Sequence, residues 1–94
     1  MQIPDKIKIG GHWLDVEEKS EKEGYDKQGT VYRWWNKIHI QADLAQSKKE
    51  SNLFHEIIHE IDHQAGAELT ENQVNTLSQG LYQVLVDNGF LKGD

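Results

Sequence analysis

Two histidines four residues apart, His55 and His59, have the type and spacing to bind a metal ion. Residues at this spacing on an α-helix lie one turn apart on the same face, so both imidazoles can reach one point beside the helix. Glu56 is rotated by about 100° from His55 on such a helix, where its carboxylate can reach a water molecule on the metal. The run His55-Glu56-Ile57-Ile58-His59 therefore predicts a site for one zinc ion with a general base, Glu56, beside it.

A catalytic zinc ion needs three protein ligands, with the fourth position left for water, so one more ligand must lie elsewhere in the chain. His63 continues the four-residue spacing, but it lies about 12 Å along the helix from His55, too far to converge on the same ion. Glu71 fits better, because it opens the next expected helix on or near the face that should pack against the first. Glu68, on the connection between the helices, is the alternative third ligand.

The first helix that must position these residues is expected to begin at Ser47. Ser47 and Glu50 have the spacing of a capping box, and Gly66 is a natural stop. Between them, apolar residues recur at the spacing of one helical face. These residues are Phe54, Ile57, Ile58, Ile61 and Ala65.

A second helix is expected from Thr70 to Asn88-Gly89. Thr70 is a suitable N-cap with Gln73 as its capping-box partner, and Asn88-Gly89 is typical of a helix end. The short connection between the helices favours antiparallel packing. The stripe of the second helix that is expected to be buried consists of Val74, Leu77, Leu81, Val84 and Leu85.

Before the helices, apolar and polar residues alternate as they do in half-buried strands. Strands are expected near residues 7–9, 13–16, 30–35 and 38–41. The charged residues 17–24 are typical of a surface loop. The predicted fold is α+β: a small antiparallel sheet of three or four strands, followed by two packed helices that carry the zinc site, in a single domain of residues 1–94.

The composition narrows the possible functions. The chain has 94 residues and no cysteine, so imidazole and carboxylate are the side chains left to bind zinc. A net charge of −6 disfavours binding to nucleic acid or to an anionic membrane, because clustered lysine and arginine hold those partners. No apolar stretch has the roughly 20 residues of a membrane span, and the start of the chain lacks a secretory signal. A cytoplasmic protein is therefore expected, with its oligomeric state open.

The HExxH run, followed at short distance by Glu71, resembles the gluzincin metallopeptidases, in particular minimal versions such as those of phages and mobile elements. The resemblance covers roughly residues 30–88. It implies that His55, His59 and Glu71 bind zinc. It also implies that Glu56 activates a zinc-bound water, which hydrolyses a peptide bond of a peptide or protein substrate.

The resemblance implies further features of the site. In that family the substrate docks along an edge strand before the HExxH helix, which corresponds here to Ile38–Gln41. An acidic residue four positions after the third ligand commonly holds a ligating histidine, and Asn75 stands at that place, with an amide that can accept an N–H but carries no charge. Tyr82 and His63 are both candidate donors to the oxyanion of the transition state.

Some alternatives remain. The metzincin motif HExxHxxGxxH does not fit, because Asp62 and Ala65 stand where it needs glycine and histidine. A non-catalytic zinc-stabilised interaction or regulatory domain is the alternative function, since so short a chain has little surface for substrate pockets. By analogy alone, compact HExxH proteins of mobile elements suggest a regulatory partner of a repressor. His39, His63 and Asp62 are expected at the surface, as is at least one of the three tryptophans.

Overall fold

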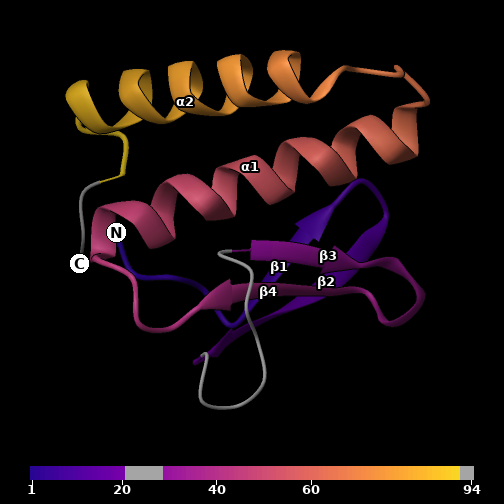
Figure 1. The fold of residues 1–94 in the computed structure, drawn as a ribbon, viewed down its shortest axis with the longest axis horizontal. Coiled ribbons are helices and arrows are strands. Elements are labelled where there is room, and N and C mark those ends of the chain that lie inside the picture. The colour runs from indigo at the N-terminus through magenta and orange to yellow at the C-terminus, as the bar shows by residue number, and fades with distance from the viewer. Residues whose placement is uncertain (21–28, 92–94) are drawn as a thin grey trace.

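The structure, a computed structural model, describes residues 1–20 and 29–91. A four-stranded sheet forms one layer, a long helix packs across it, and a second helix packs on the far side of the first (Figure 1). The strands are β1 (Lys6–Ile9), β2 (His12–Lys19), β3 (Gly29–Tyr32) and β4 (Lys37–Gln41), and a short 3-10 helix, η2 (Arg33–Trp35), joins β3 to β4. The helices are α1 (Gln46–Ala65) and α2 (Glu71–Asp87). This arrangement confirms the predicted α+β fold.

The sheet is mixed, which corrects the expectation that all its strands are antiparallel. Its order is β1-β2-β4-β3, and β2 pairs with β4 in parallel, whereas the other two pairs are antiparallel. The connection from β2 to β4, residues 20–36, is long enough for the crossover that parallel neighbours need. The loop predicted over residues 17–24 also starts too early, because β2 continues to Lys19. Residues 21–24 lie outside the described part of the chain.

The hydrophobic core lies between the sheet and α1. Side chains alternate between the two faces of a strand, and every second residue of β2 and β4 points toward α1. Ile38 and Ile40 of β4 are fully buried. The buried cluster consists of Ile9, Leu14, Val16, Ile38, Ile40 and Leu53. This packing holds α1 across the sheet and leaves the opposite face of α1 for α2.

The start of α1 differs from the prediction. The N-cap is Ala45, whose side chain makes no capping hydrogen bond. Glu50, the expected capping partner of Ser47, is instead buried and accepts hydrogen bonds from Tyr82 and Gln46. Packing of Glu50 against α2 therefore overrides the local capping signal.

The connection between the helices agrees with the prediction. Gly66 ends α1 with a φ of 65°, a left-handed conformation that favours glycine. The Thr70 hydroxyl accepts a hydrogen bond from the backbone N–H of Gln73, and the Gln73 side chain accepts one from the N–H of Thr70. The other end of α2 is at Asp87, directly before the predicted Asn88-Gly89 stop.

The apolar stripe of α2 is only partly buried, which corrects the prediction. Val74 is fully buried, whereas Leu77, Leu81 and Val84 are between 42% and 50% exposed. The reason is that α2 packs chiefly against α1 and lies on the side of α1 away from the sheet (Figure 1). One helix covers only a narrow strip of another, so the remainder of the stripe faces solvent.

All three tryptophans are exposed, which confirms the prediction that at least one is. The exposed fractions are 60% for Trp13, 94% for Trp34 and 69% for Trp35. The core is built from aliphatic side chains instead. In the described ranges, no helix has the length and apolar character that a membrane span requires.

A hydrogen bond between Tyr82 and Glu50 joins the two helices. The Tyr82 hydroxyl donates a hydrogen bond to Oε1 of Glu50 at 2.8 Å. The other carboxylate oxygen, Oε2, accepts hydrogen bonds from Nε2 of Gln46 at 3.1 Å and from the Met1 amino group at 3.4 Å. Burial acts to raise the pKa of Glu50, but the hydrogen bonds from Tyr82 and Gln46 and the charge of the amino group bring that pKa below its usual value. Burial and the bond to Glu50 raise the pKa of Tyr82 to about 12.

We expect Tyr82→Phe to lower the free energy of unfolding at pH 7 by about 1.5 kcal/mol, because a hydrogen bond to a charged group is lost. Since folding raises the pKa of Tyr82, the contribution of this residue to the free energy of unfolding is complete below the ordinary tyrosine pKa and is lost as the pH rises through about 12. Folding lowers the pKa of Glu50. The contribution of the ionised Glu50 carboxylate to the free energy of unfolding is therefore present above the ordinary carboxylate pKa and is lost as the pH falls through the lowered pKa. Urea unfolding of the wild type and of Tyr82→Phe at pH 7 measures the loss of the hydrogen bond, and wild-type measurements at successively lower acidic pH follow the loss of the Glu50 contribution. Equal stability of the two proteins at pH 7 would contradict this account.

Candidate metal centre

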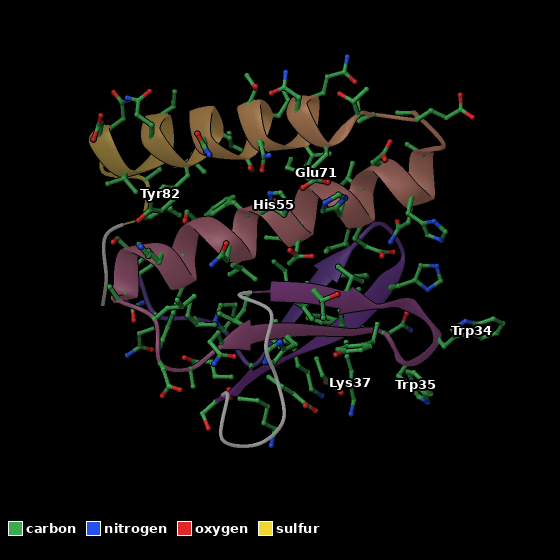
Figure 2. The ribbon with its side chains drawn as sticks, in the orientation of Figure 1. Trp34, Trp35, Lys37, His55, Glu71 and Tyr82 are labelled. Atoms are coloured by element: carbon green, nitrogen blue, oxygen red, sulfur yellow. The ribbon has the colours of Figure 1, made fainter. Side chains whose placement is uncertain are left out.

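Three predicted ligands meet between α1 and the start of α2. His55 and His59 come from the middle of α1, and Figure 2 shows His55 and Glu71 pointing toward one another across the space between the helices. Nε2 of His55 lies 2.9 Å from Oε1 of Glu71, and Nε2 of His59 lies 3.0 Å from Oε2 of the same carboxylate. The two Nε2 atoms lie 3.1 Å apart. These residues form a group that could hold a metal ion.

The chemistry of this donor set fits a cation. The ligand atoms of a tetrahedral zinc ion, with bonds of about 2.0–2.1 Å, lie roughly 3.3 Å apart, close to the distances found here. If both Nε2 atoms carried hydrogens for the carboxylate, those hydrogens would crowd each other across 3.1 Å. A shared cation removes this conflict, because all three groups then offer lone pairs to it. The Glu71 side chain is 62% exposed, so a fourth ligand can arrive from solvent.

The connection between the helices fixes the position of Glu71. The N-cap of α2 is Thr70, which forms the complete capping box with Gln73. Glu71 therefore occupies the first turn of α2 in a defined orientation. The residue before the cap, Leu69, donates its backbone N–H to Oδ1 of Asp62 at 3.1 Å. Asp62 was expected at the surface, but it is half-buried and ties the connection to the last turns of α1. A carboxylate nine residues before the first residue of a helix is a weak sequence signal, and sequence reasoning missed this positioning role.

Glu56 is buried, with an exposed fraction of 6%, and lies beside β3. Its Oε2 atom lies 3.3 Å from the place where a Cβ would stand on Gly29. A side chain at residue 29 would press on the carboxylate, and glycine leaves the room that it needs. Glu56 is not a member of the ligand group. It occupies the strip of α1 between the two histidines, His55 and His59, and the sheet.

The edge strand beside Glu56 is β3, which corrects the predicted edge strand Ile38–Gln41. Those residues belong to β4, which lies inside the sheet between β2 and β3 and is buried. Both backbone edges of β4 are therefore used by its neighbours. In the described chain, β3 pairs with β4 on one side and has no strand on the other. The face of β3 at Gly29 thus lies beside Glu56, and the open edge of β3 is on the side away from β4.

Other residues considered from the sequence lie outside the ligand group. Glu68, the alternative third ligand, is exposed on the connection between the helices. Between described residues, Asn75 makes no hydrogen bond to His55 or His59. The Tyr82 hydroxyl is bound to a carboxylate near the start of α1, and His63 is exposed. His39, expected at the surface, is 2% exposed because it lies in the central strand β4.

Comparisons of the chain with models of protein families, with curated proteins and with solved structures give no match. The resemblance to the gluzincins therefore depends on the HExxH run and on Glu71 alone. The geometry of the described residues adds that these ligands come together in space.

Proposed function

We propose that this protein is a zinc-dependent peptidase of the gluzincin type. The observation that carries the proposal is the convergence of His55, His59 and Glu71 on one point, with the buried carboxylate of Glu56 on the adjoining strip of α1. Two imidazoles and one carboxylate form a ligand set that catalytic zinc uses. The exposure of this group to solvent suits a reaction in which water is a reactant.

A zinc ion bound here would lower the pKa of a coordinated water toward about 7 and polarise a substrate carbonyl. Glu56 accepts the proton of the attacking water and then donates it to the departing amine, as general base and then general acid. Burial beside Gly29 restricts the Glu56 side chain to few conformations, which keeps its carboxylate at one place. His55 and His59 act only as ligands, together with Glu71.

The substrate is an extended peptide that adds to the open edge of β3. An exposed strand edge offers unpaired backbone N–H and C=O groups, and an extended peptide satisfies them by adding one more strand. This strand replaces Ile38–Gln41 as the docking site, since the interior position of that segment excludes it. A peptide on β3 passes along the strip of α1 that carries Glu56, below the ligand group, which brings its backbone to the reacting groups.

Treatment with a zinc chelator tests the proposal. We expect the metal-loaded protein to hydrolyse an unfolded protein or a quenched fluorescent peptide, and the chelator to reduce the rate by at least about 100-fold, because both water activation and carbonyl polarisation depend on the metal. Added zinc restores the rate. Hydrolysis that is unaffected when elemental analysis shows complete loss of metal would contradict the proposal.

A non-catalytic zinc-stabilised domain is the second candidate. The observation that favours it is the partial burial of α2, whose residues Leu77, Leu81 and Val84 face solvent. Because these apolar side chains of α2 contribute little to its packing, a metal ion that joins Glu71 to α1 would add much to the stability of the packed helix. In that case the metal-loaded protein melts at a higher temperature than the metal-free protein and cleaves no peptide.

A further inference from the structure

Three aromatic residues project from the molecule where β3 ends. Tyr32 is the last residue of β3, and Trp34 and Trp35 follow in η2. Their exposed fractions are 38%, 94% and 69%. Figure 2 shows Trp34 pointing out from this end of the sheet and Trp35 on the same side as Lys37, away from α1. We call Tyr32, Trp34 and Trp35 the aromatic corner.

The fold does not need the aromatic corner for its core. The buried cluster is aliphatic and lies on the other side of the sheet, between the strands and α1. Exposed tryptophan and tyrosine side chains are typical of binding surfaces, because each ring offers a large apolar area at a low cost in conformational entropy. Trp35 and Tyr32 also line a cavity of about 280 Å³, whose other walls are Glu17, Lys37, Ile38 and His39.

The charge of this cavity favours an uncharged occupant. Nζ of Lys37 lies 3.1 Å from Oε1 of Glu17, so these two charged groups neutralise each other in the wall formed by the described residues. The other side chains in these walls are the rings of Tyr32 and Trp35 and the imidazole of His39, whereas the side chain of Ile38 is buried in the core. An apolar side chain fits these walls better than a charged one, because a charged group would lose hydration without gaining a partner.

The aromatic corner continues the open edge of β3. Gly29, the first residue of β3, lies beside Glu56, and Tyr32 lies three residues further along the strand, about 10 Å at the usual rise of a strand. A peptide added antiparallel to β3 runs in the opposite direction. The part of the peptide at Tyr32 is then N-terminal to the part at Gly29, by about three residues.

We propose that the aromatic corner is a subsite for an apolar, preferably aromatic, side chain about three residues N-terminal to the bond that is cleaved. This inference depends on the proposed peptidase function, and it adds the class of substrate: extended peptides with an aromatic residue upstream of the cleavage point. The ring of that residue packs against Trp35 and Tyr32, which line the cavity, and Trp34 adds exposed apolar surface beside it at the end of the strand.

The test measures peptide binding to the inactive variant Glu56→Gln, loaded with zinc. Two peptides are compared that differ at one position, three residues before the bond that the wild type cleaves, where one has phenylalanine and the other glycine. If the wild type cleaves no peptide, the same exchange is made at successive positions of one peptide. We expect the phenylalanine peptide to bind about 10-fold more tightly. In the Glu56→Gln background, Trp34→Ala with Trp35→Ala removes this preference, whereas Phe90→Ala, which deletes a ring that is 70% exposed beyond α2, retains it.

Each outcome of these binding measurements either supports or contradicts the proposed subsite. Equal affinity for the two peptides, or a preference that survives loss of both tryptophans, overturns the subsite. Circular dichroism checks that the double variant is folded, which is expected because both rings are exposed. If the wild type cleaves both peptides equally well, the peptidase function holds and the subsite fails. If the wild type cleaves neither peptide but the tryptophan-dependent preference is measured, the subsite holds and the peptidase function fails.

Discussion

Replacement of Glu56 by glutamine is expected to reduce peptide hydrolysis by at least about 100-fold while zinc content stays the same. Glutamine has the same size as glutamate but cannot accept the proton of the attacking water, and general base catalysis contributes on the order of 10² to 10⁴ to a rate. Glu56 is not a ligand in the group formed by His55, His59 and Glu71, so the metal should bind as before. The measurement is the rate of cleavage of a fluorescent peptide, with metal content determined on the same sample.

Glu60→Gln is the matched control for this experiment. Glu60 lies one turn further along α1 and is also 6% exposed, so the substitution makes the same chemical change in a similar environment. We expect hydrolysis to continue in Glu60→Gln. Proteolysis that persists in purified Glu56→Gln at the wild-type rate would rule out the peptidase mechanism and would favour the non-catalytic zinc domain.

Loss of a ligand is expected to have the second large effect. We expect His59→Ala and Glu71→Ala each to weaken zinc binding by more than about 100-fold, since even residues that only support a ligand contribute 10- to 100-fold. The wild type should also gain stability from zinc, about 2.7 kcal/mol when free zinc is 100 times its dissociation constant. Melting curves with and without zinc measure this gain, which should disappear in both variants.

Glu68→Ala separates the two candidate third ligands. Glu68 is three residues before Glu71 and is exposed on the connection between the helices, outside the ligand group. Its removal should leave both zinc affinity and the melting shift unchanged. If Glu68→Ala loses zinc and Glu71→Ala keeps it, the ligand set proposed here is wrong.

The candidate site could be predicted from the sequence because its parts are local. The spacing of His55 and His59 fixes their relation on a helix, whatever surrounds them. The capping box at Thr70 defines where α2 begins, and Glu71 follows directly. A short connection then forces the two helices to pack side by side. The predicted group of His55, His59 and Glu71 therefore agrees with the group that the structure brings together.

Two expectations failed where packing decided the outcome. Ser47 does not cap α1, because its expected partner Glu50 is held by Tyr82 instead. The stripe of α2 around Leu77 and Leu81 is half-exposed, because α1 covers only part of it. Each local pattern was real, but the free energy of a cap or a stripe is smaller than that of the tertiary contacts that compete with it.

The sequence alone determined the two helices, the residues that converge between them and the chemistry that such residues can perform, since all of these depend on helical spacing and on side-chain type. Only the tertiary structure decided which strand lies at the edge. The alternation in Ile38–Gln41 predicts a strand, but pairing partners lie far apart in the chain, and no local signal states that β2 and β4 run in parallel. That pairing buries β4, leaves β3 open beside Glu56 and sets the aromatic corner at the end of the open edge.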